Sequence, residues 1–130
     1  MTHNKKDDIL KWYKKADEDI LSARILIEAS PAILDNGCFH CQQAIEKYLK
    51  SYFIYQGEQI IKTHNLNLLR EKCAVYDADF EKYNFESLND YGVEIRYPDD
   101  FLVPTIDEVR EFLQMAEDVK RLVMSKITLV

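Results

Sequence analysis

Apolar residues recur every three or four positions along most of this chain, which is the spacing of one face of an α-helix. The longest such stretch runs from about Asp8 to Ala29, with Lys14, Glu18 and Glu28 on its polar side. Only three glycines and three prolines interrupt the 130 residues, so the chain has few of the turns that a sheet protein needs. The sequence therefore predicts an all-α fold. The apolar positions of this first helix are Ile9, Trp12, Tyr13, Ala16, Ile20, Ala23 and Ile27.

A second helix is predicted from Cys38 to Tyr55, after a short connector through Asp35-Asn36-Gly37. Ser30-Pro31 ends the first helix, because the residue before a proline avoids helical backbone angles. Gly57 ends the second helix, which we expect to be the central element of the core. Its apolar positions are Cys38, Cys41, Ile45, Tyr48, Leu49, Tyr52, Phe53 and Tyr55.

A third helix is predicted to begin after an N-cap at Thr63, and a fourth helical segment is predicted over residues 80–91. An extended stretch over residues 93–97 precedes the last helix, which should begin at a capping box formed by Thr105 and Glu108. Because long helices joined by short loops pack as antiparallel neighbours, we expect one domain over residues 1–130, an up-and-down bundle of four main helices plus a short fifth helix. The apolar residues of the third and fourth segments are Leu66, Leu69, Cys73, Tyr76, Phe80, Tyr83, Leu88 and Tyr91.

The charge and hydropathy patterns exclude several classes of protein. A formal charge of −6 argues against broad binding to nucleic-acid backbone, which needs concentrated lysine and arginine, although one local basic pocket is compatible with it. No apolar run approaches the roughly 20 residues of a membrane-spanning helix, and the N-terminus lacks the apolar region of a signal peptide. We expect a cytoplasmic protein without membrane contact.

The three cysteines are predicted to be structural. Cys38 and Cys41 have the spacing of half a metal or redox motif, but they lie within a helical pattern, where free cysteine behaves as a small buried hydrophobe. A tetrahedral metal site would need two more ligands at matching spacing, and the chain has no second pair. No metal site and no cofactor are expected.

Polar residues form a row along the second predicted helix. A step of 100° per residue places them together on the side away from Ile45. One interpretation is a solvated face, with residues spaced for contacts between positions i and i+4. The other is a surface whose imidazole, amide and ammonium groups donate to a phosphate or a base. The row, with Glu46 on its flank, consists of His40, Gln43, Lys47 and Lys50.

Two further candidates follow the second helix. His64 comes directly after the predicted cap at Thr63, so its backbone N–H and the helix N-terminus would attract an anion, and Lys62 adds positive charge. The alternative is that His64 is an exposed residue of the first helical turn. Arg96 lies before Pro98 and could bind phosphate bidentately, or it could pair with Glu94, Asp99 or Asp100.

Five features of the chain, in this order and at these separations, resemble the HEPN family, named for higher-eukaryote and prokaryote nucleotide binding. They are an amphipathic first helix, the helix with Phe39-His40-x-x-Gln43-Ala44-x-Glu46-Lys47-x-x-Lys50, the turn Thr63-His64-x-Leu66, the connector Ile95-Arg96-Tyr97-Pro98 and a final helix. The resemblance implies a compact helical bundle like that of nucleotidyltransferase substrate-binding subunits. It also implies a homodimer, often encoded beside a minimal nucleotidyltransferase in toxin–antitoxin pairs, with some members acting as metal-independent ribonucleases and others proposed to bind nucleotides.

This sequence departs from the ribonuclease branch of the family, in which a histidine follows an arginine after four to six residues. No histidine follows Arg96 at that distance, nor any other arginine, and Asp99 and Asp100 would repel an RNA backbone. We therefore favour a non-catalytic module that binds nucleotide or RNA, forms a homodimer and partners a minimal nucleotidyltransferase. The alternative is a ribonuclease in which His64 or His40 works with Arg96. The predicted ligand-binding residues are His40, Gln43, Lys47, Lys50, Lys62, His64 and Arg96.

Overall fold

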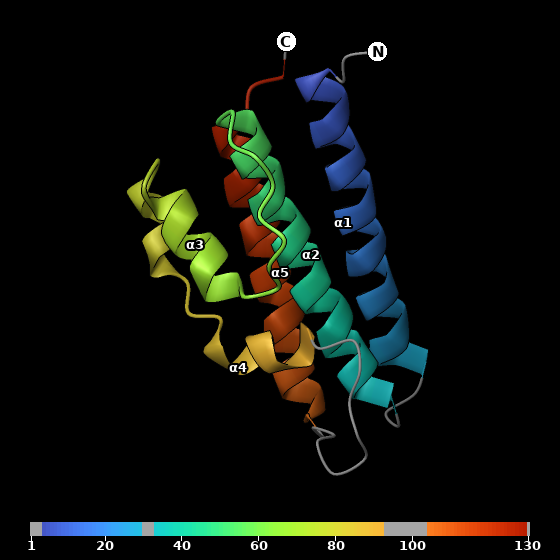
Figure 1. Cartoon of the computed structure of the whole chain (residues 1–130). Coiled ribbons are helices and arrows are strands. Elements are labelled where there is room, and N and C mark those ends of the chain that lie inside the picture. The colour runs from blue at the N-terminus through green and yellow to red at the C-terminus, as the bar shows by residue number, and fades with distance from the viewer. Residues whose placement is uncertain (1–3, 30–32, 93–103, 130) are drawn as a thin grey trace.

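Three long helices lie side by side and form the body of the molecule (Figure 1). The structure is a computed structural model, and it describes residues 4–29, 33–92 and 104–129. The long helices are α1 (Lys5–Ala29), α2 (Leu34–Tyr55) and α5 (Ile106–Lys126). A shorter helix, α3 (Leu66–Ala74), and the four-residue α4 (Glu86–Asn89) lie beside α2, with 3-10 turns at Ala78–Lys82 and Asp90–Gly92. The predicted all-α bundle of four main helices plus a short fifth is confirmed.

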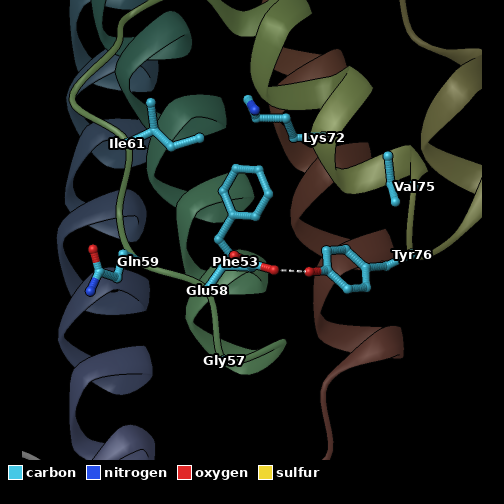
Figure 2. A pocket seen from close by; sticks show the side chains of 8 residues that line it. All are labelled: Phe53, Gly57, Glu58, Gln59, Ile61, Lys72, Val75 and Tyr76. Carbon is cyan, nitrogen blue, oxygen red and sulfur yellow. Dashed lines mark hydrogen bonds between the residues drawn. The ribbon is translucent and has the colours of Figure 1, made fainter.

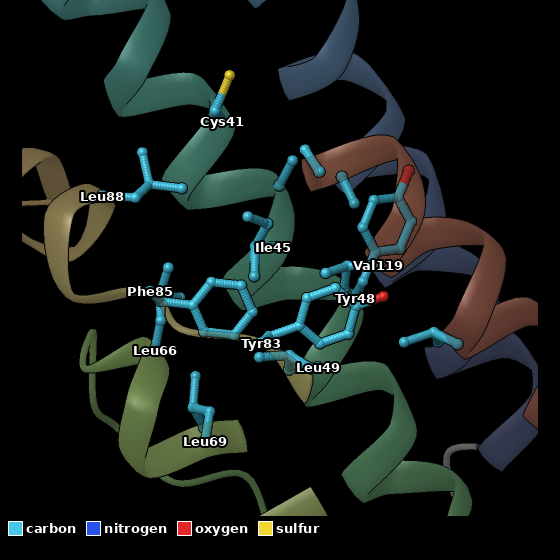
Figure 3. Packing of buried hydrophobic residues seen from close by; sticks show 14 of the residues in the cluster. Cys41, Ile45, Tyr48, Leu49, Leu66, Leu69, Tyr83, Phe85, Leu88 and Val119 are labelled. Atoms are coloured by element: carbon cyan, nitrogen blue, oxygen red, sulfur yellow. The ribbon is translucent and has the colours of Figure 1, made fainter. Parts of the chain in front are cut away.

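The core lies where α2 meets its neighbours. Tyr48 and Leu49 of α2 are fully buried, and so are Leu69 of α3, Phe85 before α4 and Val119 of α5. Figure 3 shows these side chains converging from different elements. Burying a large apolar side chain contributes roughly 1.5–3 kcal/mol. The second helix is therefore the central core element, as the spacing of its apolar positions predicts.

The second helix begins earlier than predicted. It starts at Leu34, so the expected connector Asp35-Asn36-Gly37 is its first turn. Gly37 lies at a close approach of α2 and α5, because a Cβ atom there would be 3.2 Å from Cγ1 of Val109, which is tighter than an ordinary contact. The glycine therefore permits helix contact and does not mark a turn.

The segment predicted as a fourth helix is broken into short turns. Its four apolar residues are buried as expected, but the backbone forms Ala78–Lys82, α4 and Asp90–Gly92 as separate pieces. Asp77 and Asn84 each accept a hydrogen bond from a backbone N–H two residues later, at 2.9 and 3.0 Å. Such side chains compete with a continuous helix, because they offer the backbone a local partner. The predicted extended stretch over residues 93–97 lies outside the described residues.

Of the two predicted helix caps, one is correct and one is wrong. The capping box of α5 is confirmed, with Thr105 and Glu108 exchanging hydrogen bonds of 3.1 Å. The cap of α3 is Asn65 and not Thr63, since the Asn65 side chain accepts from the N–H groups of Asn67 and Leu68 at 3.1 and 3.2 Å. The Thr63 side chain instead accepts from Asn65 N–H at 3.2 Å, one step outside the helix. None of the helices in the described ranges has an apolar stretch long enough to span a bilayer.

The cap at Asn65 gives a direct test of this part of the fold. Asn65→Ala leaves two helical N–H groups without their partner, so we expect a loss of about 1 kcal/mol in the free energy of unfolding. Asn36→Ala is the matched control, because Asn36 is an exposed helical residue without a capping role. Urea unfolding measures both. Equal stability of the two variants would contradict the assignment of Asn65 as the cap.

Candidate functional site

Two members of the polar row, His40 and Lys47, pack against a carboxylate of α1. Nδ1 of His40 lies 2.9 Å from Oδ1 of Asp19, and Nζ of Lys47 bonds to the other oxygen, Oδ2. Asp19 is buried, whereas His40 and Lys47 are partly buried. One carboxylate thus holds two members of the row and ties α2 to α1. Sequence reasoning missed Asp19, although an acid between Ala16 and Ile20 of an apolar stripe is a signal for a buried partner.

A second buried carboxylate, that of Glu46, contacts Lys50 of the row and His64 of the following connector. Glu46 has a side chain only 5% exposed, and its Oε2 lies 3.1 Å from Nζ of Lys50, which is 6% exposed. Its Oε1 lies 2.7 Å from Nδ1 of His64, whose ring is 59% exposed. The interpretation of the row as a solvated face is therefore wrong for Lys50. Glu46 joins a buried lysine of α2 to an accessible imidazole of the next connector.

A glutamine pair holds the connector in this position. Nε2 of Gln42, which is fully buried, donates to the backbone carbonyl of His64 at 3.0 Å, and Nε2 of Gln43 donates to Oε1 of Gln42 at 2.7 Å. Gln43 was predicted as a ligand-binding residue, whereas its neighbour Gln42 was missed. The prediction that His64 lies in the first turn of a helix is wrong, because it precedes the cap at Asn65. Its place is set by side chains of α2 and not by the N-terminus of α3.

His40 and His64 have the same hydrogen-bond arrangement, and it decides which ring nitrogen of each can meet a ligand. Each ring has Nδ1 beside a carboxylate, which favours the tautomer with the proton on Nδ1 and leaves Nε2 as an acceptor. Within the described part of the chain, Nε2 of His40 and of His64 has no hydrogen-bond partner. On protonation, each Nε2 becomes a donor that can meet a phosphate oxygen.

The charges of the row largely cancel. Lys47 and Lys50 are balanced by Asp19 and Glu46. Lys62 differs from the other lysines, because it is exposed and has no ion partner among residues 4–29, 33–92 and 104–129. It lies two residues before His64 on the connector. Arg96, the remaining candidate, lies outside the described residues.

The cysteines are buried, as their place in the apolar pattern predicts. Cys38, Cys41 and Cys73 form no disulfide among the described residues and have no exposed surface. Burial raises the pKa of Cys73 to about 12, and burial together with the nearby Cys38 raises the pKa of Cys41 well above its ordinary range. A thiol is a nucleophile and metal ligand only as the thiolate. In the described ranges, no group of three or more His, Cys, Asp or Glu side chains could hold a metal ion.

A separate recess lies between the end of α2 and the end of α3 (Figure 2). It has a volume of about 430 Å³, with Phe53, Ile61 and Val75 on its apolar side. The hydroxyl of Tyr76 donates to the carboxylate of Glu58 across it. None of the predicted site residues lines this recess. The polar row and the recess are therefore different surfaces.

Comparison with protein families identifies the chain. The model of the HEPN domain family matches residues 9–127, which is nearly the whole sequence. The chain belongs to the HEPN family, as the sequence resemblance predicts. No curated protein and no solved structure matches it. Membership of this family supports a nucleotide-binding or ribonuclease-type module in general.

The buried Glu46–Lys50 pair leads to a testable prediction about the free energy of unfolding. Glu46→Gln removes the counter-charge of the buried Lys50 ammonium, and uncompensated buried charges typically cost about 3–5 kcal/mol. The double variant Glu46→Gln with Lys50→Met removes the unpaired charge as well and should recover most of that loss. Chemical denaturation measures both.

The control for this prediction is Glu18→Gln. Glu18 forms an exposed pair with Lys15 at 3.2 Å, and such surface pairs contribute about 0–1 kcal/mol. A loss for Glu46→Gln no larger than that of the control would show that the pair is not held in the interior.

Proposed function

We propose that this HEPN chain is a non-catalytic nucleotide-binding and interaction module that acts in the cytoplasm. In this proposal it forms a homodimer and partners a minimal nucleotidyltransferase in a toxin–antitoxin-type pair. The observation that supports ligand binding is the Glu46–His64 contact of 2.7 Å, which holds an exposed imidazole with Nε2 directed to no protein partner in the described residues. The ligand-binding residues of this proposal are His40, Gln43, Lys47, Lys50, Lys62, His64 and Arg96.

These residues have different roles in the proposed site. His64 and Lys62 are the exposed groups, and they contact the phosphates of the ligand. His40 and Lys47 are partly buried against Asp19 and offer a second set of donors along α2. Lys50 is buried and acts by holding Glu46, which in turn orients His64. Charge-assisted hydrogen bonds of this kind are shorter and stronger than neutral ones.

The lack of the ribonuclease motif supports a binding role over a catalytic one. Metal-free cleavage of RNA needs a proton-transferring group beside a cation that stabilises the charge of the transition state. Lys47 and Lys50 each have a carboxylate counter-charge, which weakens both as such a cation. Lys47, which is partly exposed, still suits a surface that binds an anion weakly and reversibly.

Nucleotide titration tests this proposal. We expect the purified protein to bind a fluorescent ATP analogue, and Lys62→Ala or His64→Ala to weaken binding about three- to tenfold, since each loses one charge-assisted contact. Fluorescence anisotropy measures the affinities. Weaker binding at raised salt should accompany the wild-type signal, because the contacts are exposed.

The matched control is Lys11→Ala, which removes an exposed lysine of α1 away from the row. It should bind as the wild type does, and thermal melts should show that all three variants remain folded. Identical titration curves for the wild type, Lys62→Ala and His64→Ala would reject this surface as the nucleotide site.

A ribonuclease remains the second candidate. Asp19 holds Nδ1 of His40 and Glu46 holds Nδ1 of His64, which leaves Nε2 of each ring able to accept a proton. In this alternative, one of these imidazoles acts as the base and Arg96 stabilises the phosphorane. We then expect cleavage of single-stranded RNA that is insensitive to a metal chelator, and His64→Ala or His40→Ala should abolish it. Cleavage that survives both single substitutions would reject the alternative.

A further inference from the structure

The side of α1 that borders α5 carries a line of residues at the spacing of a coiled-coil seam. Successive members are separated by three, four, three, four and three positions, which is the a/d pattern of a heptad. Leu10 is 44% exposed and Leu21 is 55% exposed, so the chain leaves both apolar members of the line uncovered. Helix α1 lies at the edge of the bundle (Figure 1). The seam consists of Asp7, Leu10, Lys14, Asp17, Leu21 and Arg24.

This seam is complementary to itself when read in the opposite direction. If two copies of α1 pack antiparallel about a point between Lys15 and Ala16, Leu10 of each copy faces Leu21 of the other. In the same register Lys14 faces Asp17, and Asp7 faces Arg24. Every layer is then apolar against apolar or cation against anion. We propose that the seam is an isologous interface through which α1 binds α1 of a second copy of this chain.

Other arrangements of the same two helices place like charges together. A parallel pair in register sets Lys14 against Lys14, Asp17 against Asp17 and Arg24 against Arg24. Shifting the antiparallel pair by one heptad in one direction sets Lys14 against Arg24, and shifting it in the other sets Asp7 against Asp17. Like charges at facing positions are unfavourable. Among these arrangements, the charge pattern favours the antiparallel pair centred between Lys15 and Ala16.

The charged members of the seam have atoms available for a partner. Asp7 and Lys14 have no ion partner among the described residues. Asp17 uses Oδ1 for both the Tyr48 hydroxyl and Lys120, which lies at 3.0 Å, and this leaves Oδ2. Arg24 uses Nη2 for Glu117 and keeps its other donors. The contacts between copies would add to these internal contacts without replacing them.

The shape of this face suits a second helix. A shallow hollow of about 530 Å³ runs along it, with Leu10, Lys14, Asp17 and Leu21 on α1 and Met124 on α5 among its lining. In the complementary register the two α1 helices overlap over roughly 33 Å at 1.5 Å per residue. Two antiparallel helices of that length, flanked by α5 of each copy, provide an extended contact.

Disulfide trapping tests the register. The inference rests on the homodimer in the proposed function. The double variant Leu10→Cys with Leu21→Cys should form a covalent dimer under mild oxidation, because each new thiol faces one on the other copy. The single variant Leu21→Cys should not, since its copies would lie about 16 Å apart and a disulfide needs Cα atoms within roughly 7 Å. The native cysteines are buried and do not compete.

Sedimentation of unoxidised protein tests the interface independently. Leu21→Glu should raise the dimer dissociation constant about tenfold or more, because it places a charge in the apolar layer. Val75→Glu is the matched control, since Val75 is 82% exposed on a different face and should leave the dimer intact. A dimer unaffected by Leu21→Glu, or cross-linking of the single variant as readily as the double one, would overturn this interface.

The result also separates this inference from the proposed nucleotide site. A wild-type protein that remains a monomer would overturn the interface and the homodimer, while the nucleotide titration reports on His64 and Lys62 alone. Loss of nucleotide binding in Lys62→Ala together with a dimer that persists in Leu21→Glu would support the site and reject the seam.

Discussion

The buried carboxylate of Glu46 is the interaction on which the arrangement of the candidate site depends. It neutralises Lys50 inside the bundle and holds Nδ1 of His64, so one side chain joins the middle of α2 to the connector before α3. Removing a carboxylate from water is costly unless it is paired and hydrogen-bonded, and here both oxygens have partners. Asp19 has the same role between α1 and α2, where it holds His40 and Lys47. The polar row is thus part of the packing of the bundle as well as its candidate binding surface.

This construction limits the chemistry that the surface can perform. Two acids balance two lysines, so among the described residues the exposed ammonium group of Lys62 is the cation most available to attract an anion to this surface. Membership of the HEPN family supports a nucleotide-binding or ribonuclease-type module in general. The seam proposed on α1 shares no residue with the polar row or with Asp19, so the proposed assembly and the proposed ligand binding are tested by separate substitutions.

Sequence patterns predicted the elements of the fold well, because helical periodicity and capping boxes are local. The apolar stripe of α1, the central position of α2 and the capping box of Thr105 were all readable from spacing. The errors arose where a residue type has two uses. Gly37 resembles a turn residue, but it lies within α2, where a Cβ atom would be 3.2 Å from Cγ1 of Val109 on α5. Thr63 and Asn65 are both good caps, and the hydrogen bonds of Asn65 decide between them.

By itself the sequence determined the all-α class, the family and the residues of the polar row, because these follow from spacing along one chain. Only the tertiary structure decided which of those residues are buried and what neutralises them. Asp19 lies 21 residues before His40, and His64 lies 18 residues after Glu46, yet each pair is in hydrogen-bond contact. Partners so distant in sequence are selected by how the helices pack. Electrostatic balance depends on distance in space, and periodicity within one helix carries no information about that distance.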